Sequence, residues 1–199
     1  MTGRHRDTFT PLTAVTGLAG VLFGVIVGYL LGVSQNEVRS LPVAATSQAA
    51  AAAPAPTAVV TEQELQGWRN ILASDPKNVR ANVELGNRLY DAGRYAEAIP
   101  YYQQAYTTDP KNVSVSTDLA TAFYYAGRPD DAIAQFDRSL KIDPRHGQTL
   151  FNLGIVTRDG RHDPKGAIEI WERLLASVPD YPEAGKVRTM IAELKTRTS

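Results

Sequence analysis

The sequence contains no cysteine, and only three of its 199 residues are histidine. Without cysteine the chain cannot form disulfides, zinc–thiolate sites or a thiol nucleophile, although this does not identify the redox compartment. The formal net charge is zero, with 21 basic and 21 acidic residues. Nucleic acid is therefore not expected as a partner, because its binding depends on an excess of Lys and Arg that neutralises phosphates.

The sequence also lacks a recognisable catalytic motif. His5, His146 and His162 are widely separated, and no two of them have the i, i+4 spacing that lets two imidazoles share a metal ion. His162-Asp163 is typical of a turn, and the carboxylates are dispersed along expected helix surfaces. We therefore expect a protein that is not an enzyme and has no metal or cofactor.

One long apolar run, residues 12–33, has no charged residue. A helix of this length spans about 33 Å, which is enough to cross the hydrocarbon core of a bilayer. The run is longer than the apolar region of most signal peptides and is followed by polar residues, which favours a retained transmembrane helix. Cleavage near Ala44-Ala45 stays open as an alternative.

Flanking charges predict the orientation of this helix. Arg4, Arg6 and the amino terminus precede it, whereas Arg39 is the basic residue close behind it. The positive-inside rule then places residues 1–11 in the cytoplasm and the chain after Val33 on the other side of the membrane.

Glycines recur every fourth residue within the apolar run and share one face of the expected helix. Such a stripe allows close packing of two helices and thus a homo-oligomer, although glycine is also common in transmembrane helices generally. The four residues are Gly20, Gly24, Gly28 and Gly32. Residues 34–60, rich in Ala and Pro, are expected to form a tether without a core of their own.

A proline motif recurs along the rest of the chain, as Asp75-Pro76, Asp109-Pro110, Asp143-Pro144 and Pro179-Asp180. Pro76, Pro110, Pro144 and Pro179 are 34, 34 and 35 residues apart. A period of this length indicates stacked helix pairs, each of which buries its apolar face against its neighbours. We expect a domain at 61–199, with a first helix before residue 75, units at about 79–112, 113–146 and 147–180, and a capping helix at 181–196. The extra residue of the third unit is placed in the turn at 161–164, after a predicted turn at Asp159-Gly160-Arg161.

Small and aromatic residues recur in register within the units. Leu85-Gly86, Leu119-Ala120 and Leu153-Gly154 are followed by Tyr102, Phe136 and Trp171. This pattern resembles the tetratricopeptide repeat. The resemblance implies an all-α, right-handed superhelical stack of helix hairpins, whose first helices line a concave surface that binds a protein or peptide.

Transferring the concave positions of that family to this sequence gives a candidate groove of twelve residues. Some members of that family clamp the carboxyl tails of chaperones with residues at five groove positions. In this sequence only one of the five, Asn87, has the residue type of that clamp, so such a clamp is not expected. The five positions are Val83, Asn87, Asp118, Gln148 and Asn152. The candidate groove residues are Arg80, Val83, Asn87, Tyr90, Ser114, Thr117, Thr121, Tyr124, Gln148, Phe151, Ile155 and Arg158.

The order of anchor, tether and repeats is similar to that of bacterial envelope scaffolds and implies a single-pass protein of the inner membrane with its repeats in the periplasm. Phe123-Tyr124-Tyr125 and residues 167–171 are similar to periplasmic repeat factors of c-type cytochrome maturation, which implies a role in holding apocytochrome. A general scaffold for envelope assembly, secretion or cell division, and a self-associating structural protein, are the alternatives.

Overall fold

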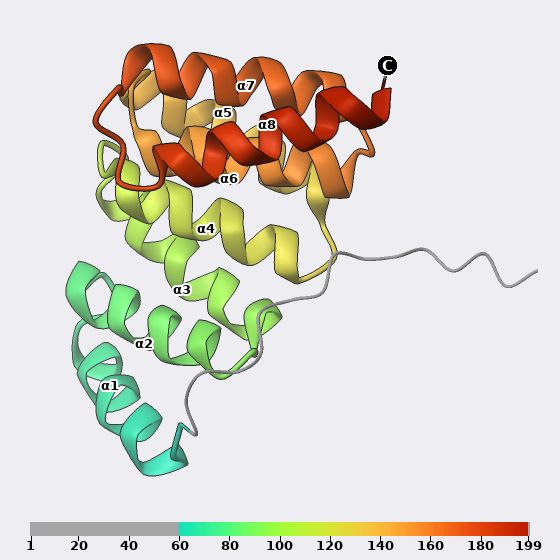
Figure 1. Cartoon of the computed structure of the whole chain (residues 1–199). Helices are drawn as coiled ribbons and strands as arrows, with labels where there is room; N and C mark the ends of the chain where they lie inside the picture. Colours follow the sequence, from blue (N-terminus) through green and yellow to red (C-terminus); the bar gives the residue numbers. More distant parts are fainter. Residues whose placement is uncertain (1–59, 199) are drawn as a thin grey trace, which may run out of the picture. The chain divides into compact units, whose positions relative to one another are not determined.

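The computed structural model describes residues 60–198, which form one stack of α-helices without any strand. Three helix hairpins, α2–α3, α4–α5 and α6–α7, follow a single helix α1 and precede a single helix α8, so that α1 and α8 lie at opposite ends of the stack (Figure 1). The expected all-α stack is therefore confirmed. The helices are α1 (Glu62–Ser74), α2 (Val79–Asp91), α3 (Tyr95–Thr108), α4 (Val113–Tyr125), α5 (Pro129–Ile142), α6 (Gly147–Gly160), α7 (Pro164–Ser177) and α8 (Ala184–Thr198).

The predicted transmembrane helix at 12–33, its glycine stripe and the tether up to Val59 lie outside the described residues. None of the helices between residues 60 and 198 combines the length and the apolar character needed to cross a bilayer.

The repeated Asp-Pro-Lys-Asn motif ends one hairpin and begins the next. Its last position is the N-cap of α2, α4 and α6, where the side chains of Asn78, Asn112 and His146 accept a bond from a backbone N–H three residues later, at 2.9, 3.2 and 3.4 Å. These bonds satisfy N–H groups that have no partner inside the helix. The Asp of the motif occupies the C-cap of α1, α3 and α5.

The turns inside the first two hairpins depend on glycine. Gly93 and Gly127 follow the C-caps of α2 and α4 with φ values of 73° and 78°, a left-handed conformation that disfavours side chains with a Cβ. The third hairpin differs from our prediction of a turn at Asp159-Gly160-Arg161. Gly160 is the last residue of α6, and His162 takes the left-handed conformation with φ 55°. The extra residue of this unit is therefore in α6, which has 14 residues where α2 and α4 have 13, and not in the predicted turn at 161–164.

Each hairpin closes around an aromatic ring of its second helix. The Trp171 ring occupies the space that a Cβ on Gly154 would need, and its Nε1 donates a hydrogen bond to the Phe151 carbonyl at 3.1 Å. Both the ring and the glycine are buried, so the two helices approach closely without leaving the indole N–H unpaired. The corresponding pairs are Gly86 with Tyr102 in the first hairpin and Ala120 with Phe136 in the second.

The first helix contributes fewer buried residues to the core than the other helices do. Leu65 is the buried residue of α1, and Ile71 remains 41% exposed. The Glu62 carboxylate lies 2.8 Å from the guanidinium of Arg94, at the start of α3, and 3.0 Å from that of Arg69. Hydrogen bonds from Arg94 and then Arg69 lower the pKa of Glu62. Exposed ion pairs of this kind contribute little and are screened by salt.

Candidate functional site

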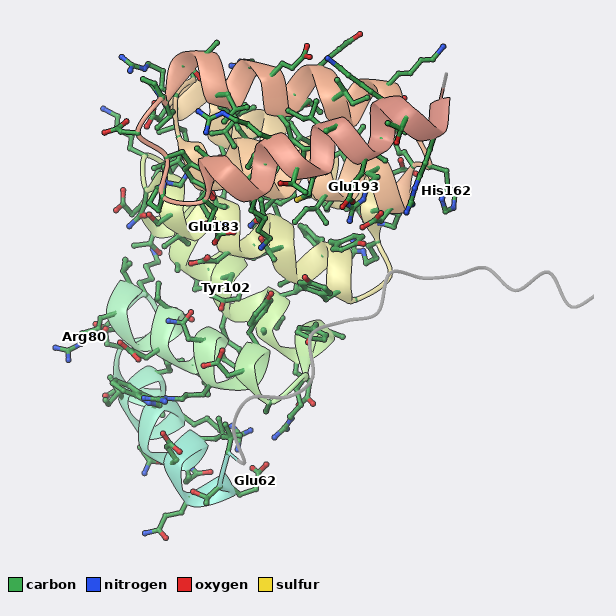
Figure 2. All side chains as sticks on the ribbon, viewed as in Figure 1. Glu62, Arg80, Tyr102, His162, Glu183 and Glu193 are labelled. Atoms are coloured by element: carbon green, nitrogen blue, oxygen red, sulfur yellow. The ribbon has the colours of Figure 1, made fainter. Side chains whose placement is uncertain are left out.

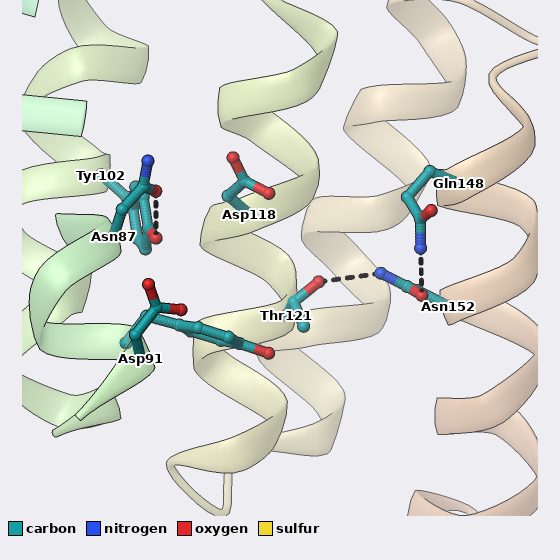
Figure 3. A pocket seen from close by; sticks show the side chains of 8 residues that line it. Asn87, Asp91, Tyr102, Asp118, Thr121, Gln148 and Asn152 are labelled. Carbon is teal, nitrogen blue, oxygen red and sulfur yellow. Dashed lines mark hydrogen bonds between the residues drawn. The ribbon is translucent and has the colours of Figure 1, made fainter. Parts of the chain in front are cut away.

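An open cavity of about 370 Å³ lies beside the first helices of the three hairpins (Figure 3). Such a volume falls in the lower part of the range for ligand pockets. The lining side chains come from α2, α3, α4 and α6, so residues separated by more than sixty positions in the sequence meet here. They are Asn87, Tyr90, Asp91, Tyr102, Asp118, Thr121, Gln148 and Asn152.

One wall of the cavity is formed by Asn87 and Tyr102. The Tyr102 hydroxyl reaches from α3 and donates to Asn87 Oδ1 at 2.8 Å. Gly86 makes this approach possible, because a Cβ at that position would lie 2.8 Å from the tyrosine ring. The small residue of the repeat thus positions a ring that closes the first hairpin and lines the cavity.

The opposite wall is a chain of hydrogen bonds between α6 and α4. Gln148 Nε2 donates to Asn152 Oδ1 at 2.8 Å, and Asn152 Nδ2 donates to Thr121 Oγ1 at 3.1 Å. The Thr121 hydroxyl in turn donates to the Thr117 carbonyl at 2.8 Å. Asn152 and Thr121 are therefore fixed in orientation before any ligand arrives (Figure 3).

The Asp118 carboxylate lies between these two walls (Figure 3). Burial raises its pKa to about 6, since a charged carboxylate loses hydration in this position. Burial also raises the pKa values of Tyr90 and Tyr102, and the negative charges of Asp118 and Asp91 add to both shifts. The cavity therefore has a negative potential. Among residues 60–198 no group of three His, Asp or Glu is arranged to hold a metal ion.

Six of the twelve candidate groove residues lie at this cavity or at a smaller one beside it. The smaller cavity has a volume of about 20 Å³ and continues between α4 and α6. Asn87, Tyr90, Thr121 and Gln148 line the larger cavity, and Thr121, Tyr124 and Ile155 line the smaller one.

Val83, Thr117 and Phe151 occupy one position of the repeat, and the last two lie against the following hairpin or cap. Thr117 is 2% exposed, and its hydroxyl lies 2.7 Å from that of Thr149 in α6. The Phe151 ring is buried 5.9 Å from the Tyr181 ring, ahead of α8. Neither offers a free surface to a ligand. Val83 is half-buried.

The three remaining candidates lie elsewhere. Arg80 is exposed and points into solvent at the start of α2 (Figure 2), and Ser114 is exposed at the start of α4. The Arg158 guanidinium is held by both oxygens of Asp159, at 2.5 and 2.6 Å, and lies over the Trp171 ring at 5.4 Å. Its hydrogen bonds to Asp159 raise the pKa of Arg158.

Four cavity residues are absent from the candidate list: Asp91, Tyr102, Asp118 and Asn152. Asp118 and Asn152 occupy two of the five chaperone-clamp positions, so the clamp positions of the family could have identified them from the sequence. Asp91 is at the last position of α2. Tyr102 belongs to the second helix of its hairpin. It reaches the cavity because its side chain is long and because Gly86 leaves room for the ring.

The hairpin geometry defines a helical repeat protein with an open groove, and the sequence comparison identifies the repeat. Residues 89–152 match the family described as tetratricopeptide repeat. The match supports tetratricopeptide repeats within these residues, and the eight-helix stack extends the same arrangement of helix hairpins on both sides of them. No curated protein matches the chain in sequence.

Solved structures with the same fold are distant in sequence. YrrB, described as a TPR protein with an unusual peptide-binding site, has a TM-score of 0.58 at 20% identity over 64% of this chain and 65% of its own. MamA has a TM-score of 0.56 at 20% identity over 68% of this chain and 88% of its own. The Yersinia enterocolitica secretion chaperone SycD, in complex with a peptide of the translocator YopD, has a TM-score of 0.56 at 16% identity over 61% and 95%. These similarities show the fold.

Proposed function

We propose that the helical stack is a scaffold that binds a peptide segment of a partner protein in the cavity beside α2, α4 and α6. The observation that carries this proposal is the cavity itself, where polar groups from four helices converge without filling the space. YrrB and SycD support it, because the description of each names a peptide-binding site or a bound peptide. Scaffolds of this kind are generally not enzymes, which agrees with the lack of a catalytic motif.

The chemistry of the walls suits an extended peptide. Asn87 and Gln148 are amides that can pair with the N–H and C=O groups of a peptide backbone, and Tyr90 adds a flat apolar face with a polar tip. Because Asn152 and Thr121 are already oriented by hydrogen bonds, little side-chain ordering is needed when the ligand binds.

A blocking substitution tests this proposal. Gln148 is exposed at the rim of the cavity, so Gln148→Trp should fill the space without disturbing the core. A displayed library of random dodecapeptides would be selected on the full chain, with Asp137→Trp as the control, since Asp137 is exposed on α5, which does not line the cavity. We expect selected peptides to bind the chain and the control but not Gln148→Trp. If no selected peptide distinguishes the two variants, the cavity is not the binding site.

The proposal extends to the location of the scaffold. The apolar run at 12–33 and the charges around it support a single-pass protein of a bacterial inner membrane, with residues 1–11 in the cytoplasm and the repeats in the periplasm. Alkaline phosphatase fused after Ser199 should be active in intact cells, because it folds outside the cytoplasm. If the fusion were made in normal amounts but were inactive, the predicted orientation would be wrong and the repeats would lie in the cytoplasm.

The biological process has several candidates within this proposal. Apocytochrome is one partner suggested by the sequence, but Phe123 and Trp171, two of the residues behind that resemblance, are buried and serve packing. Apocytochrome peptides that bind no better than their scrambled versions would remove this candidate in favour of a general envelope scaffold. Self-association through the glycine stripe predicts that Gly24→Ile/Gly28→Ile weakens dimers in membranes.

A further inference from the structure

We propose that the cavity holds the cationic side chain of an arginine or lysine of the bound peptide, with Asp118 as its counter-ion. This inference rests on the proposed peptide-binding function and specifies which peptides the cavity prefers. Three observations carry it: the hydrogen-bonding groups left open in the cavity, the absence of a partner for Asp118 among the described residues, and the balance of charge along the walls.

The open hydrogen-bonding groups of the cavity include one amide donor, Asn87 Nδ2, and a larger set of acceptors. Asn152 and Thr121 are already engaged through their hydrogen-bond chain. Gln148 uses its amide nitrogen in that chain, which leaves its oxygen to accept a bond from a ligand. The carboxylates of Asp118 and Asp91 add acceptors that have no hydrogen-bond partner among residues 60–198. The acceptors of Asp91, Asp118 and Gln148 are best complemented by a ligand group with several N–H donors.

Asp118 combines two features: burial raises its pKa, and none of the ion pairs among residues 60–198 includes it, whereas Asp137, which also lacks an ion pair, is exposed. Glu62, Glu97 and Asp131 each lie within 3.0 Å of an arginine nitrogen. Asp118 forms no ion pair in the described part of the chain, and burial is the cause that raises its pKa. A partly dehydrated carboxylate without an ion-pair partner is stabilised by an incoming positive charge.

The charge of the cavity walls also favours a cationic ligand. Asp91 and Asp118 are the charged residues among the eight that line the cavity, and neither lysine, arginine nor histidine accompanies them there. A peptide carboxylate or phosphate would therefore meet repulsion. A guanidinium offers five N–H donors in a planar group, and an ammonium offers three, so either can engage Asp118 and a second acceptor at once.

The test uses peptides selected from the random dodecapeptide library on the full chain, purified in mild detergent. Selected peptides are resynthesised with each arginine replaced by citrulline, which keeps the shape of the side chain and removes its charge. Their dissociation constants are measured on the native chain, on Asp118→Asn and on Asp137→Asn, an identical change at an exposed position of α5. Thermal unfolding of each variant shows whether it is folded.

We expect cavity-dependent peptides to be enriched in arginine or lysine. Both citrulline and Asp118→Asn should weaken their binding about tenfold or more, with no further loss when the two changes are combined, while Asp137→Asn should have no effect. Peptides that are blocked by Gln148→Trp yet contain no basic residue, or bind Asp118→Asn normally, would overturn this inference and leave the peptide-binding function intact. A library without any Gln148→Trp-sensitive peptide would overturn both.

Discussion

Replacing Asp118 by asparagine should make the protein more stable at neutral pH, although the same change should impair binding. Burial raises the pKa of Asp118 from the ordinary 3.8 to about 6. The protonated carboxyl is thus favoured in the folded chain, and its contribution to stability is fully present below pH 3.8 and is lost as the pH rises through about 6. At 1.36 kcal/mol per pKa unit, the loss amounts to about 3 kcal/mol at pH 8.

Asparagine has nearly the same shape and does not ionise, so it escapes this loss. Because water in the open cavity reduces the penalty, we expect Asp118→Asn to raise the free energy of unfolding by about 1–3 kcal/mol at pH 8 and by about 0.5 kcal/mol or less at pH 4. Urea unfolding, followed by far-UV circular dichroism and by the fluorescence of the buried Trp171, measures both values.

The exposed counterpart Asp137→Asn should change the free energy of unfolding by less than about 0.5 kcal/mol at either pH. A variant Asp118→Asn that is no more stable than the native chain at pH 8 would refute the argument that desolvation dominates at this carboxylate. An equal gain at pH 4 and pH 8 would refute it as well, because the effect would then not depend on ionisation.

Further predictions concern the cavity and the packing of the hairpins. Binding of an arginine peptide should weaken as the pH falls from 7.5 to 5, because Asp118 becomes protonated, whereas Asp118→Asn should show no such decline. Of the groups that face Asp118, α2 supplies Asp91 and Tyr90, α3 supplies Tyr102, and α6 supplies only amides. Gly154→Ala should lower the free energy of unfolding by about 1–3 kcal/mol because the new Cβ meets the Trp171 ring, whereas Gly185→Ala, with open space around it, should raise it by about 0.5 kcal/mol; thermal unfolding measures both. His162→Gly should stabilise the α6–α7 turn by about 0.5–1 kcal/mol in the same assay, since His162 has a left-handed φ.

The repeat architecture could be predicted from the sequence because local chemistry recurs with a fixed period. Asn78 and Asn112 both cap the start of a helix with a side-chain oxygen. Gly93 and Gly127 both allow the left-handed backbone that follows the end of a helix. The prediction was wrong at Gly160, where one added residue could extend the helix or lengthen the turn. Comparison with the first two units placed Gly160 in the turn. In the structure α6 includes Gly160, and His162 takes the left-handed conformation that glycine has in the other two turns.

The cavity could be predicted only in part. Helical periodicity identified the first helices of the hairpins, and Asn87, Tyr90, Thr121 and Gln148 followed from it. Periodicity does not tell whether a position on such a helix opens to solvent or packs against the next hairpin, which is the situation of Thr117. Nor does it show that Tyr102 reaches across from a second helix, because that depends on the space left by the neighbouring glycine.

The single buried residue of α1 has a mechanical consequence if the chain is tethered to a membrane at its N-terminus. A pulling force applied at Val60 would reach α1 first and would load the contact of Leu65 and the ion pairs Glu62–Arg94 and Glu64–Arg88 before the later hairpins. In a stack of repeats, each unit depends mainly on its neighbours. The first helix can therefore detach under load while α2, α4 and α6 keep their arrangement, so that a bound partner would stay in place as the connection to the membrane lengthens.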